Sequence, residues 1–311
     1  MNFGSNKIIL NLILFLITVL STFFVGLTWS LSFLYADLLS ENPDAALEFN
    51  LFHDSQVFVL SLVYSITLLG ILSGHELGHF LACRHYRINA TLPFFIPAPT
   101  LVGTLGAFIK IKSPITKKHQ LFDIGVAGPL TGFILSVPAL IYGLSISKVV
   151  PPIPKEGSLI FGEPLLLKII GNLLFRDIPR DFDVILHPVA FAGWVGIFVT
   201  ALNLFPIGQL DGGHVAYALL GSRARNLARI FFGIYIILGI FFWIGWFLWA
   251  LIILILGLKH PRVIDEEMPL SPQRKFIGFV MLLIFILTFI PDPIKGYSSS
   301  SLWEGLKNWI F

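Results

Sequence analysis

The chain has 311 residues, of which 56% are hydrophobic and 13% are charged, and its formal net charge at pH 7 is +3. Together with a mean hydropathy of +0.84, this composition excludes an ordinary soluble globular domain, in which about a quarter of the residues are charged. The small positive charge gives no reason to expect nucleic acid as a partner. We therefore expect an integral membrane protein, with the lipid bilayer as its surroundings.

Apolar runs of about 20 residues, the length that crosses a bilayer core as a helix, recur along the chain. They predict an all-α polytopic membrane protein with six to seven transmembrane helices. The expected spans are Ile8–Leu34, Val57–Ala82, Leu121–Ser147, Val184–Leu204 and Phe276–Ile290, together with a longer apolar block over Leu227–Leu258.

The block over Leu227–Leu258 decides between the two counts. At about 1.5 Å per residue it would make about 48 Å of helix, whereas a bilayer core is about 30 Å thick. It therefore forms either one oblique helix or two short ones. The aromatic cluster "FFWIGWFLW" lies in its middle, with Gly245 as a possible turn, and aromatic rings favour the membrane interface. We prefer the hairpin, which gives seven spans.

Charged residues beside the first span predict its orientation. Lys7 precedes this span, whereas residues 35–54 contain acids and neither Lys nor Arg. Because cytoplasmic loops are enriched in Lys and Arg, we expect a cytoplasmic N-terminus and, within residues 1–56, one helix followed by an acidic extracytoplasmic loop. With a hairpin, Lys259 and Arg262 are also cytoplasmic. We expect the membrane to be a bacterial inner membrane.

The largest segments outside the spans are residues 94–119 and 148–183. In the first, Gly103 and Gly106 precede Phe108 and further β-favouring residues, which predicts a small membrane-associated β element near residues 94–112. In the second, we expect a short amphipathic helix over Leu165–Phe175.

The stretch "LSGHELGHFL" places ionisable groups inside an apolar span. His75 and His79 are four residues apart, so on a helix both imidazoles lie on one face, one turn apart, where they can ligate zinc. Glu76 can lie beside the metal and take a proton from a water molecule. Such groups are costly in lipid, so they must face a protein interior or a water-filled cavity.

A catalytic zinc usually has a third protein ligand. His85 lies six residues beyond His79, on roughly the opposite side of the helix, and does not fit. Asp211 is the only acid between Asp183 and Asp265, and it follows an apolar span at the helix-breaking Pro206. It is therefore the better candidate for the third ligand. The alternative is that Asp211 caps a helix that begins near Gly212.

Three motifs in this order resemble the site-2 protease family of intramembrane zinc metalloproteases, peptidase family M50. They are "HELGH" at 75–79, "GVAGPLTG" at 125–132 and "NLFPIGQLDGG" at 203–213. The resemblance implies that His75, His79 and Asp211 ligate Zn²⁺ and that Glu76 activates a water molecule. It also implies that Asn203 stabilises the oxyanion of the reaction.

The resemblance further implies a catalytic core of three helices over residues 57–220, followed by C-terminal helices over 221–311. The glycines of 125–132 would permit close helix packing. Gly103, Gly106 and Phe108 would bind an extended substrate along a strand edge. The substrate would be a membrane protein with a transmembrane helix. Because "HELGH" and "LDGG" both fall near the cytoplasmic ends of their expected spans, we expect the cut toward the cytoplasm. The chain looks most like the branch without a PDZ domain, which includes plastid-type members and their bacterial relatives; the oligomeric state is left open.

Two interpretations from other classes stay open: a multi-pass transporter, or an inactive scaffold with a structural metal site. A transporter would not need a glutamate after the first of two such histidines, and the chain retains Glu76 and every proposed ligand, so we favour catalysis. His214 either contacts Asp211 or is simply a polar residue at the start of a helix. Cys83, the single cysteine, is expected to be a packing residue.

Overall fold

A computed structural model describes residues 5–36, 54–152, 159–176, 178–179, 182–258, 263 and 268–297. Within these ranges the chain is mostly helical. Helices at Ile8–Leu34, Ser55–His85, Lys118–Ser145 and Asp211–Phe241 are long and apolar enough to cross a membrane. They confirm the predicted multi-pass helical architecture. Residues 37–53 of the predicted acidic loop 35–54 lie outside the described ranges, as do the basic residues Lys259 and Arg262.

The chain divides into two compact units. Unit 1 comprises Met1–Pro114, Leu130–Ile153 and Ile170–Val199, and unit 2 comprises Ile115–Pro129, Pro154–Ile169 and Thr200–Phe311. Three helices contribute residues to both units: α5 (Lys118–Ser145), α6 (Leu165–Leu174) and α7 (Pro188–Asn203). Helix α6 confirms the predicted amphipathic helix almost to the residue.

In unit 1, helices α1 (Ser5–Leu34) and α4 (Ser55–His85) pack through small side chains. A Cβ on Gly26 would lie 2.9 Å from the carbonyl oxygen of Ser61, and the hydroxyls of Thr22 and Ser65 share a hydrogen bond of 2.7 Å. Small residues let helix backbones approach closely where lipid offers no hydrophobic driving force between helices. The backbones of α1 and α4 therefore approach each other closely at Gly26 and Ser61.

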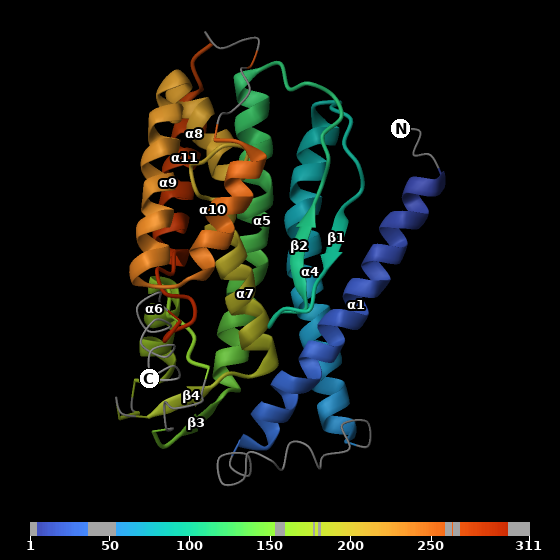
Figure 1. Cartoon of the computed structure of the whole chain (residues 1–311), viewed down its shortest axis with the longest axis vertical. Helices are drawn as coiled ribbons and strands as arrows, with labels where there is room; N and C mark the ends of the chain where they lie inside the picture. The colour runs from blue at the N-terminus through green and yellow to red at the C-terminus, as the bar shows by residue number, and fades with distance from the viewer. Residues whose placement is uncertain are drawn as a thin grey trace, which may run out of the picture. The chain divides into compact units, whose positions relative to one another are not determined.

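A β-hairpin packs beside both of these helices (Figure 1). Strands β1 (Phe94–Pro97) and β2 (Thr104–Phe108) pair antiparallel, with a shift of register between Phe95 and Pro97. The hairpin confirms the β element predicted near residues 94–112. A second antiparallel pair, β3 (Lys148–Val150) with β4 (Asp183–Ile185), was not predicted.

The second half of α5 packs against α7 within unit 1. A Cβ on Gly143 would lie 2.1 Å from the backbone nitrogen of Ala190, and one on Gly193 would lie 2.7 Å from the backbone nitrogen of Leu140. The predicted span Val184–Leu204 is wrong at its start, because residues 183–185 form β4 and the helix begins only at Pro188. Proline suits a first helical position, where its missing N–H has no helical partner to lose.

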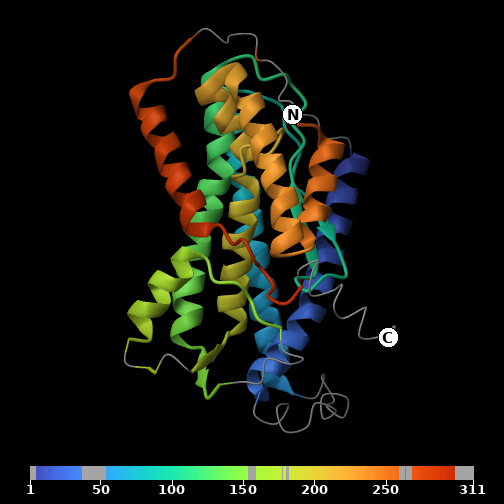
Figure 2. The same ribbon diagram turned by 60° about the vertical axis from the view of Figure 1, so that its left-hand side comes forward.

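In unit 2 the block over Leu227–Leu258 forms two helices. They are α9 (Ala224–Phe241) and α10 (Gly245–Leu256), which lie side by side (Figure 1, Figure 2). The preference for a helical hairpin is thereby confirmed, whereas the count of six to seven spans is not.

The remaining helices of unit 2 are α8 (Asp211–Leu220) and α11 (Pro272–Thr288), with a one-turn 3-10 helix at Gly221–Arg223 between α8 and α9. Arg274 of α11 forms a two-pronged ion pair with Asp123 near the start of α5, at 2.9 and 2.7 Å. Phe205 packs in an aromatic cluster with Tyr235 and Trp246. Two residues of the aromatic-rich block, Tyr235 and Trp246, thus pack inside unit 2.

Cys83 lies near the end of α4 and has a relative exposure of 0%. This burial agrees with its predicted role as a packing residue.

Candidate metal centre

Helix α4 positions the motif HELGH. Its 31 residues continue past the motif, so the helical period brings His75 and His79 one above the other. Both are buried, at 4% and 6% exposure, as is Glu76 at 6%. Gly74, just before the motif, admits the second half of α5, because a Cβ there would lie 2.2 Å from Cδ1 of Leu135. The motif thus faces protein, as the cost of ionisable groups in lipid requires.

The two imidazoles turn the same nitrogens toward each other. The Nε2 atoms of His75 and His79 lie 3.2 Å apart. Two nitrogens at about 2.0–2.1 Å from one ion, at the tetrahedral angle, would be about 3.3 Å apart. The pair therefore fits two adjacent corners of a zinc tetrahedron.

Asp211 is positioned by a compact turn between α7 and α8. A Cβ on Gly212 would lie 2.0 Å from the carbonyl oxygen of Leu204, and one on Gly213 would lie 2.5 Å from the carbonyl oxygen of Gly208. Only glycine permits these approaches, so the chain folds back tightly before α8. Asp211 is the first residue of α8, and the N-cap residue is Leu210, which makes no side-chain cap. Asp211 therefore does not occupy the capping position of the alternative interpretation.

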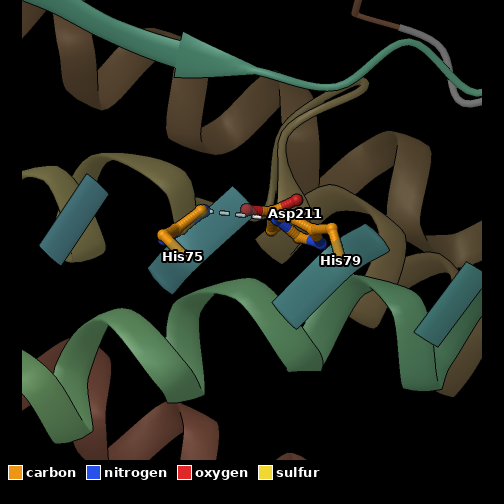
Figure 3. Close-up of side chains that lie close together, drawn as sticks. All are labelled: His75, His79 and Asp211. Carbon is orange, nitrogen blue, oxygen red and sulfur yellow. Dashed lines mark hydrogen bonds between the residues drawn. The ribbon is translucent and has the colours of Figure 1, made fainter. Parts of the chain in front are cut away.

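His75 and His79 each offer a ring nitrogen as a ligand atom, and Asp211 offers a carboxylate oxygen (Figure 3). Two imidazole nitrogens and a carboxylate oxygen are a donor set typical of catalytic zinc, which keeps its fourth position for water or substrate.

Two further residues considered for the site, Asn203 and His214, lie shortly before and shortly after Asp211 along the chain. Asn203 is the last residue of α7 and is half-buried. His214 lies in the first turn of α8, and a Cβ on Gly125 would be 2.9 Å from the Cβ of His214 and 3.1 Å from the carbonyl oxygen of Asp211. The first glycine of "GVAGPLTG" thus permits the predicted close packing, here between α5 and α8.

The three residues predicted to bind substrate lie in or next to strand β2, in different surroundings. Gly103 is buried, has φ +88° and contacts α1, whereas Gly106 has φ +102° and open space where a Cβ would be. Phe108 is 48% exposed, and its ring stacks on Phe94 with centroids 5.6 Å apart. Their role in binding stays a prediction.

Three residues beside the hairpin were not singled out from the sequence: Ser21, Trp29 and Tyr64. Each donates a side-chain hydrogen bond to the hairpin turn. The available signal was weak, since it consisted of isolated polar groups in apolar helices.

The chain matches a known protein family and several named proteins. Residues 63–246, more than half of the chain, match the family model described as peptidase family M50. The chain is 32% identical over 300 residues to the probable zinc metalloprotease EGY1, chloroplastic, of Arabidopsis thaliana, an alignment covering 91% of this chain and 53% of the relative. It is 29% identical over 244 residues to the Arabidopsis thaliana probable zinc metalloprotease EGY2, chloroplastic, covering 76% of this chain and 43% of the relative.

A rice relative, the probable zinc metalloprotease EGY1, chloroplastic, of Oryza sativa subsp. japonica, is 34% identical over 226 residues, which are 70% of this chain and 38% of the relative. The chain spans about half the length, or less, of these curated relatives. All three are named chloroplastic, so they give no support to the predicted bacterial inner membrane. They agree with the predicted likeness to plastid-type members.

Proposed function

Because the chain belongs to peptidase family M50, the site-2 protease family, we propose that it is a zinc-dependent endopeptidase that cuts membrane proteins within the bilayer. The observation that carries this proposal is the buried pair of Nε2 atoms, 3.2 Å apart, on a helix apolar enough to span a membrane. Glu76, buried beside this pair, supplies the base that a transporter or scaffold would not need.

His75, His79 and Asp211 would hold the zinc. When bound, zinc would act as a Lewis acid that makes a water molecule more acidic and polarises the substrate carbonyl. Glu76 takes a proton from the attacking water and returns it to the leaving amine. The side-chain amide of Asn203 donates a hydrogen bond to the oxyanion as the carbonyl carbon becomes tetrahedral.

A peptide bond in a transmembrane helix is protected by the helix's own hydrogen bonds and by the lack of water. The substrate must therefore unwind, and β2 offers a strand along which an extended segment can pair through main-chain hydrogen bonds. Gly106 and Phe108 would contact that segment, and Gly103 would shape the turn that precedes the strand.

We place the catalytic core at residues 57–220 and cleavage on the cytoplasmic side. Helices α7, α10 and α11 would cross the membrane in addition to α1, α4, α5 and α9, giving seven crossings. Membrane proteins with a transmembrane helix are the proposed substrates.

The test is cleavage of a panel of single-span membrane proteins by the purified full chain in liposomes, with bound zinc measured on the same samples. Glu76→Gln should retain zinc and lose at least about 100-fold in cleavage rate, because only the proton transfer is removed. Asp211→Ala should weaken zinc binding by more than about tenfold, because a ligand is lost.

The matched control is Glu163→Gln, which neutralises an exposed acid and should change neither quantity. A correctly folded wild type that binds no stoichiometric zinc would overturn the metalloprotease assignment. Full cleavage by Glu76→Gln would overturn the role of that residue.

A further inference from the structure

The turn of the β1–β2 hairpin is bound by side chains from two helices at three successive carbonyl groups. Trp29 Nε1 donates to the carbonyl oxygen of Leu101 at 2.9 Å, and the Tyr64 hydroxyl donates to that of Val102 at 2.9 Å. The Ser21 hydroxyl donates to the carbonyl oxygen of Gly103 at 2.7 Å. Ser21 and Trp29 belong to α1, and Tyr64 belongs to α4.

The end of the turn also sits directly on the backbone of α1. A Cβ on Gly103 would lie 2.7 Å from the Cα of Thr22 and 2.8 Å from the carbonyl oxygen of Ser21, and the φ of Gly103 is +88°. Both the space and the backbone conformation therefore require glycine. The turn cannot shift along α1 without breaking this contact.

The two helices that hold the turn form one framework. Thr22 and Ser65 join α1 to α4 through their hydroxyls, and Tyr64 has a relative exposure of 0%. The rings of Trp29 and Tyr64 both pack on Phe191 of α7, with centroids 4.4 and 5.8 Å away. The donors that hold the turn are thus themselves fixed by packing.

Strand β2 follows the turn without an intervening residue, since it begins at Thr104. Its apolar side chains Leu105 and Phe108 are exposed, and Gly106 has open space beside it. Strand β2 is paired along its other side with β1, so the two strands move together, and the turn is where side chains of α1 and α4 hold this hairpin. A displacement of the turn would shift the hairpin, and with it the edge of β2, relative to α1 and α4.

We infer that Ser21, Trp29 and Tyr64 are positioning residues that fix the register in which β2 presents its edge to the substrate. This inference rests on the proposed function, because it assigns a role within the same protease site. The family match begins at residue 63, so it assigns no role to α1. Helix α1 carries none of the proposed metal ligands, but through Ser21 and Trp29 it would help to select the bond that is cut.

The experiment compares Ser21→Ala, Trp29→Phe and Tyr64→Phe with wild type in liposomes, with substrate expressed as a mole fraction of lipid. Each change removes one donor to the turn and keeps most of the side chain. KM should rise about three- to tenfold per variant, with kcat changed less than about twofold, because the lost bond holds the binding strand and not the reacting groups. Mass spectrometry of the products should show cleavage spread over neighbouring peptide bonds.

Thr28→Ala is the matched control. It also removes a side-chain hydrogen bond on α1, but the Thr28 hydroxyl donates to Val25 of the same helix and not to the hairpin. It should cleave with wild-type KM at the wild-type bond. Ser21→Thr keeps the hydroxyl and should restore both quantities. Unchanged KM and an unchanged cleavage site in all three variants would overturn the inference, and so would a fall in kcat alone.

A readout independent of cleavage separates this inference from the proposed function. Hydrogen–deuterium exchange of the amides of residues 98–108 should quicken at least about threefold in the three variants and not in Thr28→Ala. If the wild type cleaves nothing, the protease proposal fails, and exchange still tests the attachment of the turn. Equal exchange in wild type and variants would overturn the inference in either case.

Discussion

At the scale of single residues, His187 combines a structural contact with a titratable group. Its Nδ1 accepts a hydrogen bond of 3.2 Å from the backbone N–H of Val189, so it caps the start of α7. Its own backbone N–H donates to the Ser147 hydroxyl at 2.9 Å, and its ring packs edge-on against Phe33. Burial lowers the pKa of His187 below its usual value.

We predict that acid weakens the fold through His187. Its pKa is lower in the folded chain than in the unfolded chain, so below about pH 6.5 the unfolded state binds more protons, and stability falls as pH falls. Protonation of Nδ1 would also remove the acceptor that caps α7. Thermal unfolding in detergent should therefore occur at a lower temperature at pH 5 than at pH 7.5.

His187→Asn keeps a side-chain acceptor at the cap but does not titrate in this range. The variant should lose part of the difference between the two pH values. An equal difference in wild type and variant would show that other groups cause it.

The sequence was sufficient to single out candidate metal ligands by their local spacing. His75 and His79 are one helical turn apart wherever a helix forms, and Asp211 stands out as an acid that no neighbouring acid accompanies. Ser21 and Tyr64 could not be predicted, because their partners lie 82 and 38 residues away along the chain. Hydroxyls in apolar helices usually bond to their own helix, as that of Thr18 does, so their presence alone carries no signal.

At the scale of elements, the contact between α5 and the first turn of α8 supports Asp211, the proposed metal ligand. Gly125→Ala would place a methyl group 2.9 Å from the Cβ of His214 and 3.1 Å from the carbonyl oxygen of Asp211. We predict a loss of about 1–3 kcal/mol in stability, because a packed contact becomes overfilled. Zinc binding should weaken together with the stability, as measured by competition with a chelator.

Gly233→Ala provides the control within the same unit, because no atom lies within 4 Å of a Cβ at this position of α9. It should leave zinc binding unchanged and should not destabilise the chain, since alanine favours a helix more than glycine does. Weaker zinc binding in both variants would remove the argument for a specific contact at Gly125.

Elements with a long apolar pattern could be predicted, and elements formed by distant partners could not. The division of the aromatic block into α9 and α10 followed from its length, which exceeds a bilayer core. Strands β3 and β4 have 3 residues each, too few for an alternating pattern. The two strands lie on either side of α6 along the chain. Neither segment has a sequence pattern that indicates the other as its partner.

At the scale of the whole molecule, composition was enough to predict a multi-pass helical membrane protein, but not the number of crossings. Helices α7, α10 and α11 have 16, 12 and 17 residues, fewer than the roughly 20 that cross a bilayer core upright. The apolar stretch Asp211–Phe241 is long enough to cross, yet Gly221 at its middle has φ +58°. Length and hydropathy therefore leave open whether this stretch crosses as one helix or turns back.

The burial of Cys83 has a chemical consequence for this question. Since the only cysteine of the chain is fully buried, the native protein should resist thiol reagents, and any introduced cysteine would be read against a silent background. Lys117→Cys, Ser145→Cys and Ser222→Cys place thiols at exposed positions. The reagent is a membrane-impermeant maleimide, added to sealed vesicles from their extracytoplasmic face. If seven crossings are right, only Ser145→Cys should react there, and all three variants should react once the vesicles are opened. A Ser222→Cys variant that stays unreactive in opened vesicles would place that residue in the bilayer, on a single crossing helix.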